Sequence, residues 1–255
     1  MVPLKKLVRG VALMYPKLIS DALYGRFYEI GEGIFVPSST TVTQFGAPMS
    51  FTLLKYIMKE ADGDYEKYLK SSSDALVVGT DVHTAWEHLI EGKKVTIDPP
   101  NAEIQRALTC LCMFYEQYQP KIVAMETMLS HKDYGYAGRA DTVAYIGDDL
   151  WMLDVKTSKV LDPFKFSLQL TMYANLWNAN NKEQITRLGV IHGKKNYRGS
   201  IPAKSTKLLH EYPFDQEGVK SALYMFNRSY EAFDKKGILK RKPKLNNEFK
   251  LKGVK

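Results

Sequence analysis

Segment 136–159 contains two strand-like runs on either side of Gly147 and Asp148. Glycine at the first central position of a two-residue loop suits a type II′ turn, so this segment is predicted to form a β-hairpin. Residues at equal distances from the turn then face each other, which places Asp141 opposite Asp154. Opposed residues in an antiparallel pair have Cβ atoms roughly 4.5–5.5 Å apart. The hairpin therefore predicts two neighbouring carboxylates.

These two carboxylates would lie among apolar neighbours, where their mutual repulsion and desolvation make the ionised forms costly. A bound divalent cation removes that cost, and hard carboxylate oxygens suit Mg²⁺ or Mn²⁺. Lys156 follows Asp154 by two residues, so both side chains leave the same face of the strand. Two acids and a lysine at one point form an arrangement for metal-assisted phosphodiester hydrolysis.

Three motifs in this order resemble those of the RecB-like branch of the PD-(D/E)XK nuclease superfamily. Residues 138–141 match G-x-x-D, residues 153–158 match D-x-K-T, and residues 169–173 match Q-x-x-x-Y. Two further matches lie upstream, a P-S-x-T-x-V helix entry at 37–42 and G-x-x-x-H at 79–83. The chain is thus similar to phage and mitochondrial single-strand exonucleases of this branch.

The resemblance implies roles for particular side chains. Asp141, Asp154 and Lys156 would be catalytic. One or two Mg²⁺ or Mn²⁺ ions would be held by the two aspartates together with His83 and the main-chain carbonyl of Val155. Possible accessory residues are Glu126, Gln169 and Tyr173; the last two are spaced i, i+4 and so share a helix face.

The expected fold class is α/β, with a restriction-endonuclease-like core: a central mixed β-sheet flanked by helices, and an added N-terminal helical region. A hairpin is predicted at 26–36, followed by a helix with a Ser or Thr N-cap. Helical patterning continues over 51–60 and 65–91, with a break expected at Ser71–Ser73. The remaining predicted strands are 122–130, 136–146, 150–157, 185–192 and 208–214, and the remaining helices are 102–118, 164–180 and 216–235.

The chain of 255 residues is long enough for one large domain, and no linker divides it. We expect a single nuclease domain over 1–239, with the N-terminal hairpin and helices at about 24–118 and the catalytic core at about 121–235. Residues 240–255 hold seven basic residues against one acid, so +6 of the net charge of +8 lies in a basic C-terminal tail. The bulk charge therefore permits nucleic-acid binding without deciding it.

Two cysteines, Cys110 and Cys112, lie two residues apart in a predicted helix and point to different sides. They cannot supply the four-cysteine iron–sulfur cluster that some RecB-like nucleases carry. No stretch approaches the ~18 apolar residues of a membrane-spanning helix, and we expect no membrane partner. A cytoplasmic location follows as an expectation, in the host cytoplasm if the protein is viral.

The predicted function is that of a metal-dependent DNA exonuclease, with single-stranded or end-processed DNA as the partner. Lys194, Lys195, Tyr197 and Arg198 follow a strand end and combine bases with an aromatic ring, which suits backbone contact and stacking or, alternatively, an ordinary polar turn. Three alternatives stay open: an endonuclease of the same superfamily, a non-cleaving nucleic-acid-binding module, and an unrelated metalloenzyme acting on small phosphoesters.

Overall fold

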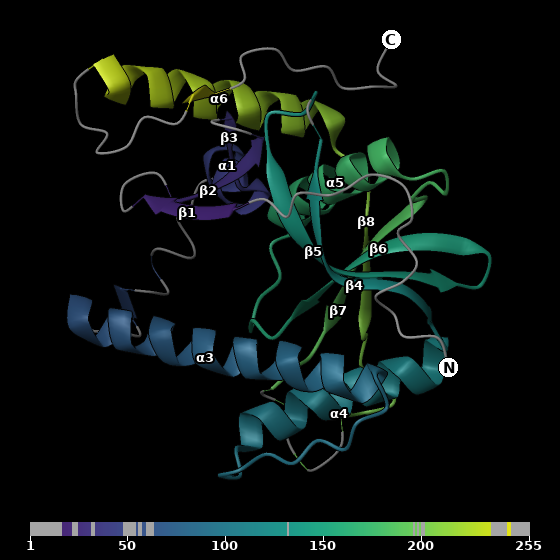
Figure 1. The fold of residues 1–255 in the computed structure, drawn as a ribbon. Helices are drawn as coiled ribbons and strands as arrows, with labels where there is room; N and C mark the ends of the chain where they lie inside the picture. The colour runs from purple at the N-terminus through teal and green to yellow at the C-terminus, as the bar shows by residue number, and fades with distance from the viewer. Residues whose placement is uncertain are drawn as a thin grey trace.

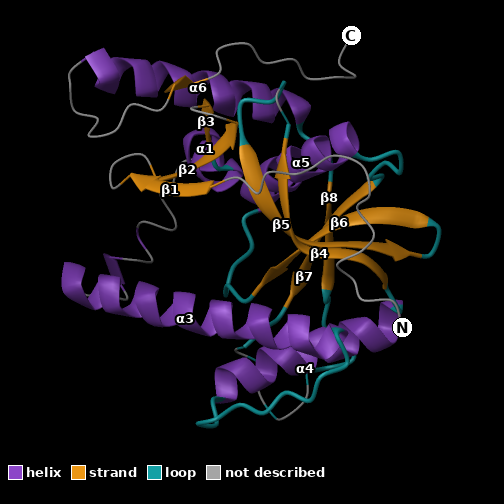
Figure 2. Cartoon of the chain, in the orientation of Figure 1, coloured by secondary structure: helices purple, strands orange, loops and turns teal. Residues whose placement is uncertain are grey.

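The computed structural model describes residues 17–21, 25–31, 34–47, 55, 58–59, 64–131, 133–195, 197, 199, 202–235 and 244–245. Its centre is a five-stranded sheet of order β4-β5-β6-β7-β8 (Figures 1 and 2). The strands β4, β5 and β6 form an antiparallel meander, β6 and β7 run parallel, and β8 returns antiparallel to β7. The bounds are β4 Lys121–Ser130, β5 Ala137–Ile146, β6 Asp149–Lys156, β7 Arg187–His192 and β8 Leu209–Tyr212.

Helices cover both faces of this sheet, as Figure 1 shows. On one side lie α3 (Tyr65–Ile90) and α4 (Ala102–Tyr118), which pack on Trp151, Leu153 and Val155 of β6. On the other side lie α1 (Ser39–Gly46), α5 (Pro163–Asn180) and α6 (Gln216–Lys235). The predicted fold class, a mixed central sheet flanked by helices, is confirmed.

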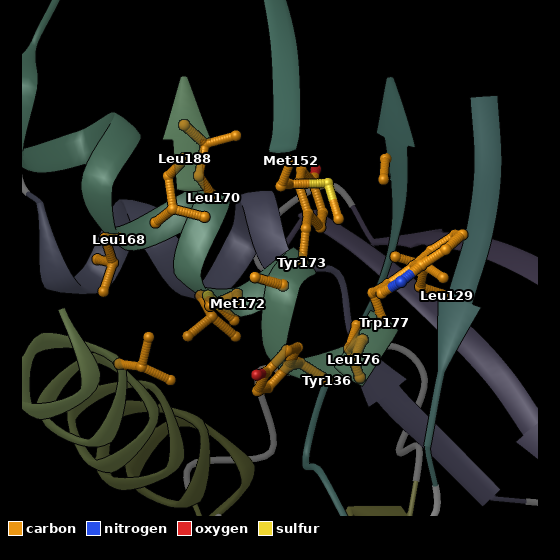
Figure 3. Packing of buried hydrophobic residues seen from close by; sticks show 14 of the residues in the cluster. Leu129, Tyr136, Met152, Leu168, Leu170, Met172, Tyr173, Leu176, Trp177 and Leu188 are labelled. Atoms are coloured by element: carbon orange, nitrogen blue, oxygen red, sulfur yellow. The ribbon is translucent and has the colours of Figure 1, made fainter. Parts of the chain in front are cut away.

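Helix α5 forms the crossover between β6 and β7 and is buried at every position from Phe166 to Trp177. Asp162 caps its N-terminus by accepting from the N–H of Lys165, and Pro163 occupies the first helical turn, where its missing N–H costs nothing. Figure 3 shows Leu170 near Leu188 of β7 and Tyr173 near Met152 of β6, whereas Met172 lies on the other side of α5, near Thr43 of α1. Because α5 is buried on all sides over this stretch, it fits only between two layers.

A second, smaller sheet of order β1-β2-β3-β9 precedes the core in the chain, apart from its last strand. Its strands are β1 Lys17–Asp21, β2 Gly25–Gly31, β3 Ile34–Pro37 and β9 Lys244–Leu245. The ring centroid of Phe27 in β2 lies 6.1 Å from that of Phe226 in α6. This contact attaches the small sheet to the layer of helices that contains α1, α5 and α6. Lys244 and Leu245 are the part of the predicted tail that the structure describes; the rest of 240–255 lies outside the described residues.

Most predicted elements are found within two residues of their expected ends. Ser38 is the N-cap of α1 and Asn101 that of α4. The predicted hairpin at 26–36 is β2 and β3, while most of the helix expected at 51–60 lies outside the described residues. Among the helices that the structure describes, none is both long enough and apolar enough to cross a membrane.

The break expected at Ser71–Ser73 was wrong, because α3 runs without interruption from Tyr65 to Ile90. These serines are exposed, so a helical conformation costs them no buried contact. The helix is stabilised at its start by Asp64, whose carboxylate accepts from the N–H groups of Glu66 and Lys67. Serine costs a helix only a few tenths of a kcal/mol relative to alanine, roughly, and three of them did not suffice to end one.

Gly138 of β5 generates a stability prediction. A Cβ at this position would lie 2.5 Å from Cε1 of Tyr173 and 2.8 Å from Oγ of Ser39. Gly138→Ala is therefore expected to lower the free energy of unfolding by about 1–3 kcal/mol, the usual cost of overpacking. Denaturant unfolding followed by circular dichroism measures the change.

Gly79→Ala is the matched control, since a Cβ there meets only Thr157 Oγ1 at 3.8 Å inside α3. Alanine in a helix interior is favoured over glycine by roughly 0.5–1 kcal/mol, so this variant should be neutral or more stable. Equal stability of the two variants would contradict the packing assigned to Gly138.

Candidate metal and catalytic site

The β5–β6 hairpin has the predicted register. Its paired residues run from Ile146 with Asp149 to Thr142 with Leu153, and Gly147 has φ +62° at the turn, as a type II′ loop requires. Cross-strand pairing stops just before Asp141 and Asp154. There Asp141 Oδ2 accepts a hydrogen bond of 3.0 Å from the backbone N–H of Val155. The first acid is thus fixed against the backbone of the strand that carries the second.

Asp154 is buried, and its closest partner is Lys156, with 2.5 Å between Oδ2 and Nζ. Apart from this ion pair, neither carboxylate oxygen has a hydrogen-bond partner among the described residues. Burial raises the pKa of Asp154 to about 6, against the opposing charge of Lys156. The pKa of Lys156 is raised in turn, because Asp154 and Asp141 outweigh its own burial and keep the ammonium charged.

His83 of α3 reaches the two strands from above. Its Nε2 lies 2.8 Å from the carbonyl oxygen of Val155, so a proton on Nε2 makes that nitrogen the donor. Nδ1 faces two carboxylates, 3.5 Å from Asp141 Oδ2 and 3.6 Å from Glu126 Oε1. Burial lowers the pKa of His83, but Glu126 and Asp141 outweigh it and raise the pKa above its ordinary value.

His83, Glu126 and Asp141 together offer ligand atoms that all lie within 4.8 Å of one another. Such a set of one imidazole nitrogen and two carboxylate oxygens could hold a divalent metal ion. Asp154 is not one of these three residues, but its buried Oδ1, which has no partner among the described residues, is a further potential donor. Glu126, expected only as an accessory residue, thus enters the cluster, while the Val155 carbonyl faces His83.

Glu126 takes this position through an unusual backbone conformation. Its φ is +48°, in the left-handed region that residues other than glycine, asparagine and aspartate rarely adopt. One carboxylate oxygen faces His83, and the other is 2.6 Å from Nε of Arg139. Arg139 was missed by the sequence reasoning. Arg139 lies two residues before Asp141 and hence on the same face of β5, and this spacing could have predicted its place at the site.

Gln169 and Tyr173 lie on the buried face of α5, as their spacing predicted. Gln169 Nε2 donates to the Tyr173 hydroxyl at 3.1 Å. Burial raises the pKa of Tyr173 to about 12, and the charges of Asp154 and Asp141 add to the effect. The phenol is therefore a neutral group beside the two acids, and Figure 3 shows its ring packed near Met152.

The segment expected to contact nucleic acid is partly engaged elsewhere. Lys195 Nζ forms an ion pair of 2.9 Å with Glu103, and the Tyr197 hydroxyl donates to the backbone carbonyl of Arg106 at 3.3 Å. Both partners belong to α4. Lys194 is half-buried, and Arg198 lies outside the described residues.

Neither a family model nor a curated protein matches the chain. Fourteen chains of solved structures match it. One is the crystal structure of LHK-Exo in complex with dAMP, which is 10% identical, with a TM-score of 0.38, and covers 79% of this chain and 93% of its own. Similarity of this degree carries no argument about activity. What the fold and the site define directly is a mixed α/β protein with a candidate divalent-metal site on its central sheet.

The raised pKa values of Asp154 and His83 predict a pH-dependent affinity for metal. Below about pH 6 both groups carry protons that a metal ion must displace, so the apparent affinity should fall as the pH is lowered, by about ten-fold per pH unit for each proton. The rise in unfolding temperature with added Mn²⁺, titrated at about pH 5, 6 and 7, measures this.

The control is Asp154→Asn, which removes one of the two groups whose protons the metal displaces. In this variant the Mn²⁺ affinity should fall by about ten-fold less per pH unit than in the unsubstituted protein. A Mn²⁺ midpoint that does not change with pH in the unsubstituted protein would contradict the assignment of these groups as ligands.

Proposed function

We propose that this protein is a metal-dependent DNA exonuclease of the RecB-like branch of the PD-(D/E)XK superfamily. Its substrate would be single-stranded or end-processed DNA in replication, recombination or repair. The observation that carries the proposal is the convergence of His83, Glu126 and Asp141 beside buried Asp154 and its partner Lys156. Histidine, acids and lysine come from four separate elements, and an incidental surface cluster has no reason to enclose a carboxylate.

The residues that would hold Mg²⁺ or Mn²⁺ are His83, Asp141 and Asp154, with Glu126 as a further donor. The Val155 carbonyl, which was expected to be a ligand, contacts His83 Nε2 instead. A bound ion supplies Lewis-acid polarisation of the scissile phosphate, a more acidic water and neutralisation of the leaving oxygen. Val155 N–H fixes the orientation of the Asp141 carboxylate. The Val155 carbonyl fixes His83 by accepting from Nε2, an outer contact of the kind that metal-binding histidines make.

Lys156 would orient the attacking water or stabilise the negative charge that develops on the phosphate. The neighbouring carboxylates keep it charged, so it serves as an electrostatic group and not as a proton acceptor. Tyr173, held neutral and hydrogen-bonded to Gln169, would brace the two strands or position the substrate strand. The basic tail at 240–255 would add non-specific affinity for the phosphate backbone.

Substitution of the buried pair is the first test of this mechanism. Asp154→Asn and Lys156→Ala should each lower the cleavage rate by about 10²–10³-fold or more, because each removes a group that acts on charge in the transition state. Cleavage of an end-labelled oligonucleotide measures the rate, and circular dichroism checks that each variant is folded. Arg228→Ala, which removes an exposed ion pair on α6, should keep the full rate. Activity of either purified site variant comparable to that of the unsubstituted protein would contradict the catalytic roles given to Asp154 and Lys156.

The topology of the substrate separates the proposed exonuclease from its alternatives. Linear single-stranded DNA and a covalently closed circle of the same sequence are incubated with Mg²⁺, with Mn²⁺ and with EDTA. Metal-dependent loss of the linear form alone is expected, since an exonuclease needs a free end. Cutting of the circle would instead indicate an endonuclease. Binding without cutting would indicate a binding module, and metal binding without DNA affinity would indicate an enzyme of small phosphoesters.

A further inference from the structure

Arg139 is a charged residue at the candidate site to which the proposed mechanism gives no task. It lies on β5, two residues before Asp141 and on the same face of the strand. Its side chain is 56% exposed, whereas that of its partner Glu126 is 18% exposed. A cation therefore stands between solvent and the acidic cluster.

The contact of Arg139 with Glu126 uses only one edge of the guanidinium group. Nε lies 2.6 Å from Glu126 Oε2, and in the part of the chain that the structure describes this is the one ion pair given to Arg139. Arginine has five N–H donors in a fixed planar fork, so both terminal nitrogens keep theirs. Two parallel donors of this kind match two oxygens of a phosphate.

The charges of the site show why a second anchor for phosphate is needed. A phosphodiester that approaches the cluster meets the carboxylates of Glu126, Asp141 and Asp154. Lys156 is paired with Asp154 at 2.5 Å, and its side chain is 27% exposed against 56% for that of Arg139. Arg139 is thus the more exposed of these two cations, and it contacts the same carboxylate that faces His83.

We propose that Arg139 binds a backbone phosphate of the nucleic acid beside the metal cluster, through its two terminal nitrogens, while Nε holds Glu126. Arg139 is thus a substrate-binding residue of the proposed nuclease, and the inference rests on that proposed function. The guanidinium of Arg139 would couple the substrate to the metal site, because it would orient the Glu126 carboxylate and hold the nucleic-acid strand at the same time. The contact reads the phosphate backbone and carries no base specificity.

Binding and cleavage are tested separately. In a Lys156→Ala background with Mn²⁺, where cleavage is expected to be lost, the affinity for a fluorescent single-stranded oligonucleotide is measured against salt concentration. Adding Arg139→Ala should weaken binding by about ten- to one-hundred-fold, as for a lost hydrogen bond to a charged group. It should also reduce the slope of log affinity against log salt by roughly 0.7, the value for one phosphate contact to a single strand.

A phosphate scan then locates the contact. Oligonucleotides that carry one neutral methylphosphonate each are compared on the two proteins. At one position the neutral group should weaken binding about ten-fold when Arg139 is present and less than about two-fold when it is alanine. Arg139→Lys should restore the salt slope, since it keeps the charge, but not the full affinity, since it cannot serve Glu126 and a phosphate together. Arg228→Ala is the matched control for loss of an exposed arginine from an ion pair.

The contrary result has its own signature. If Arg139 only holds Glu126, Arg139→Ala leaves the salt slope and the phosphate scan unchanged and shifts the Mn²⁺ midpoint of thermal stabilisation in the absence of DNA, and the proposal is overturned. Failure of the proposed function looks different: the protein with Arg139 intact neither binds nor cuts nucleic acid in Mn²⁺. Normal cleavage by the unsubstituted protein together with an unaltered Arg139→Ala variant would reject this inference alone.

Discussion

The ion pair of buried Asp154 with half-buried Lys156 is the interaction on which the arrangement of the site depends. A carboxylate enclosed between two layers of helices is costly in its charged form, and one ammonium group at 2.5 Å compensates only part of the cost, since the pKa of Asp154 stays raised to about 6. Replacement by apolar residues of similar size would stabilise many folds of this kind. A chain that keeps such a pair accepts lower stability at a place where charge is needed, which is typical of functional sites.

The layers around this pair explain how residues distant in sequence meet there. Helix α5 can be buried from Phe166 to Trp177 only because α6 and α1 cover its outer side, and this places Tyr173 beside the two acids. Gly138 leaves room for the tyrosine ring and for Ser39 at the start of α1. On the opposite side, the apolar contacts of α3 and α4 with β6 bring His83 to the backbone of Val155. The site is thus a product of both cores, and a change of packing in either one displaces a ligand.

Local chemistry predicted the elements and part of the site. The turn at Gly147 is a signal carried by neighbouring residues, so the hairpin register followed from it. The proximity of His83 to Asp141 came from a motif. By contrast, the ion pair of Arg139 with Glu126 depends on the left-handed backbone conformation of Glu126. Glutamate has no preference for that conformation, so the sequence does not predict it. The pairing of Lys195 with Glu103 depends likewise on the docking of α4 against the end of β7, which periodicity does not encode.

The acids of the site differ in burial, and the difference assigns them different physical tasks. Glu126 and Asp141 keep partial exposure and are contacted by Arg139, His83 and a backbone N–H, so an ion arriving from solvent can reach them. Asp154 is enclosed, where each charge interaction is stronger because little water screens it. The burial that raises its pKa therefore also increases what a divalent cation gains by binding there. The burial of Asp154 therefore both destabilises the metal-free fold and strengthens metal binding, and a substitution that removed the first effect would also remove the second.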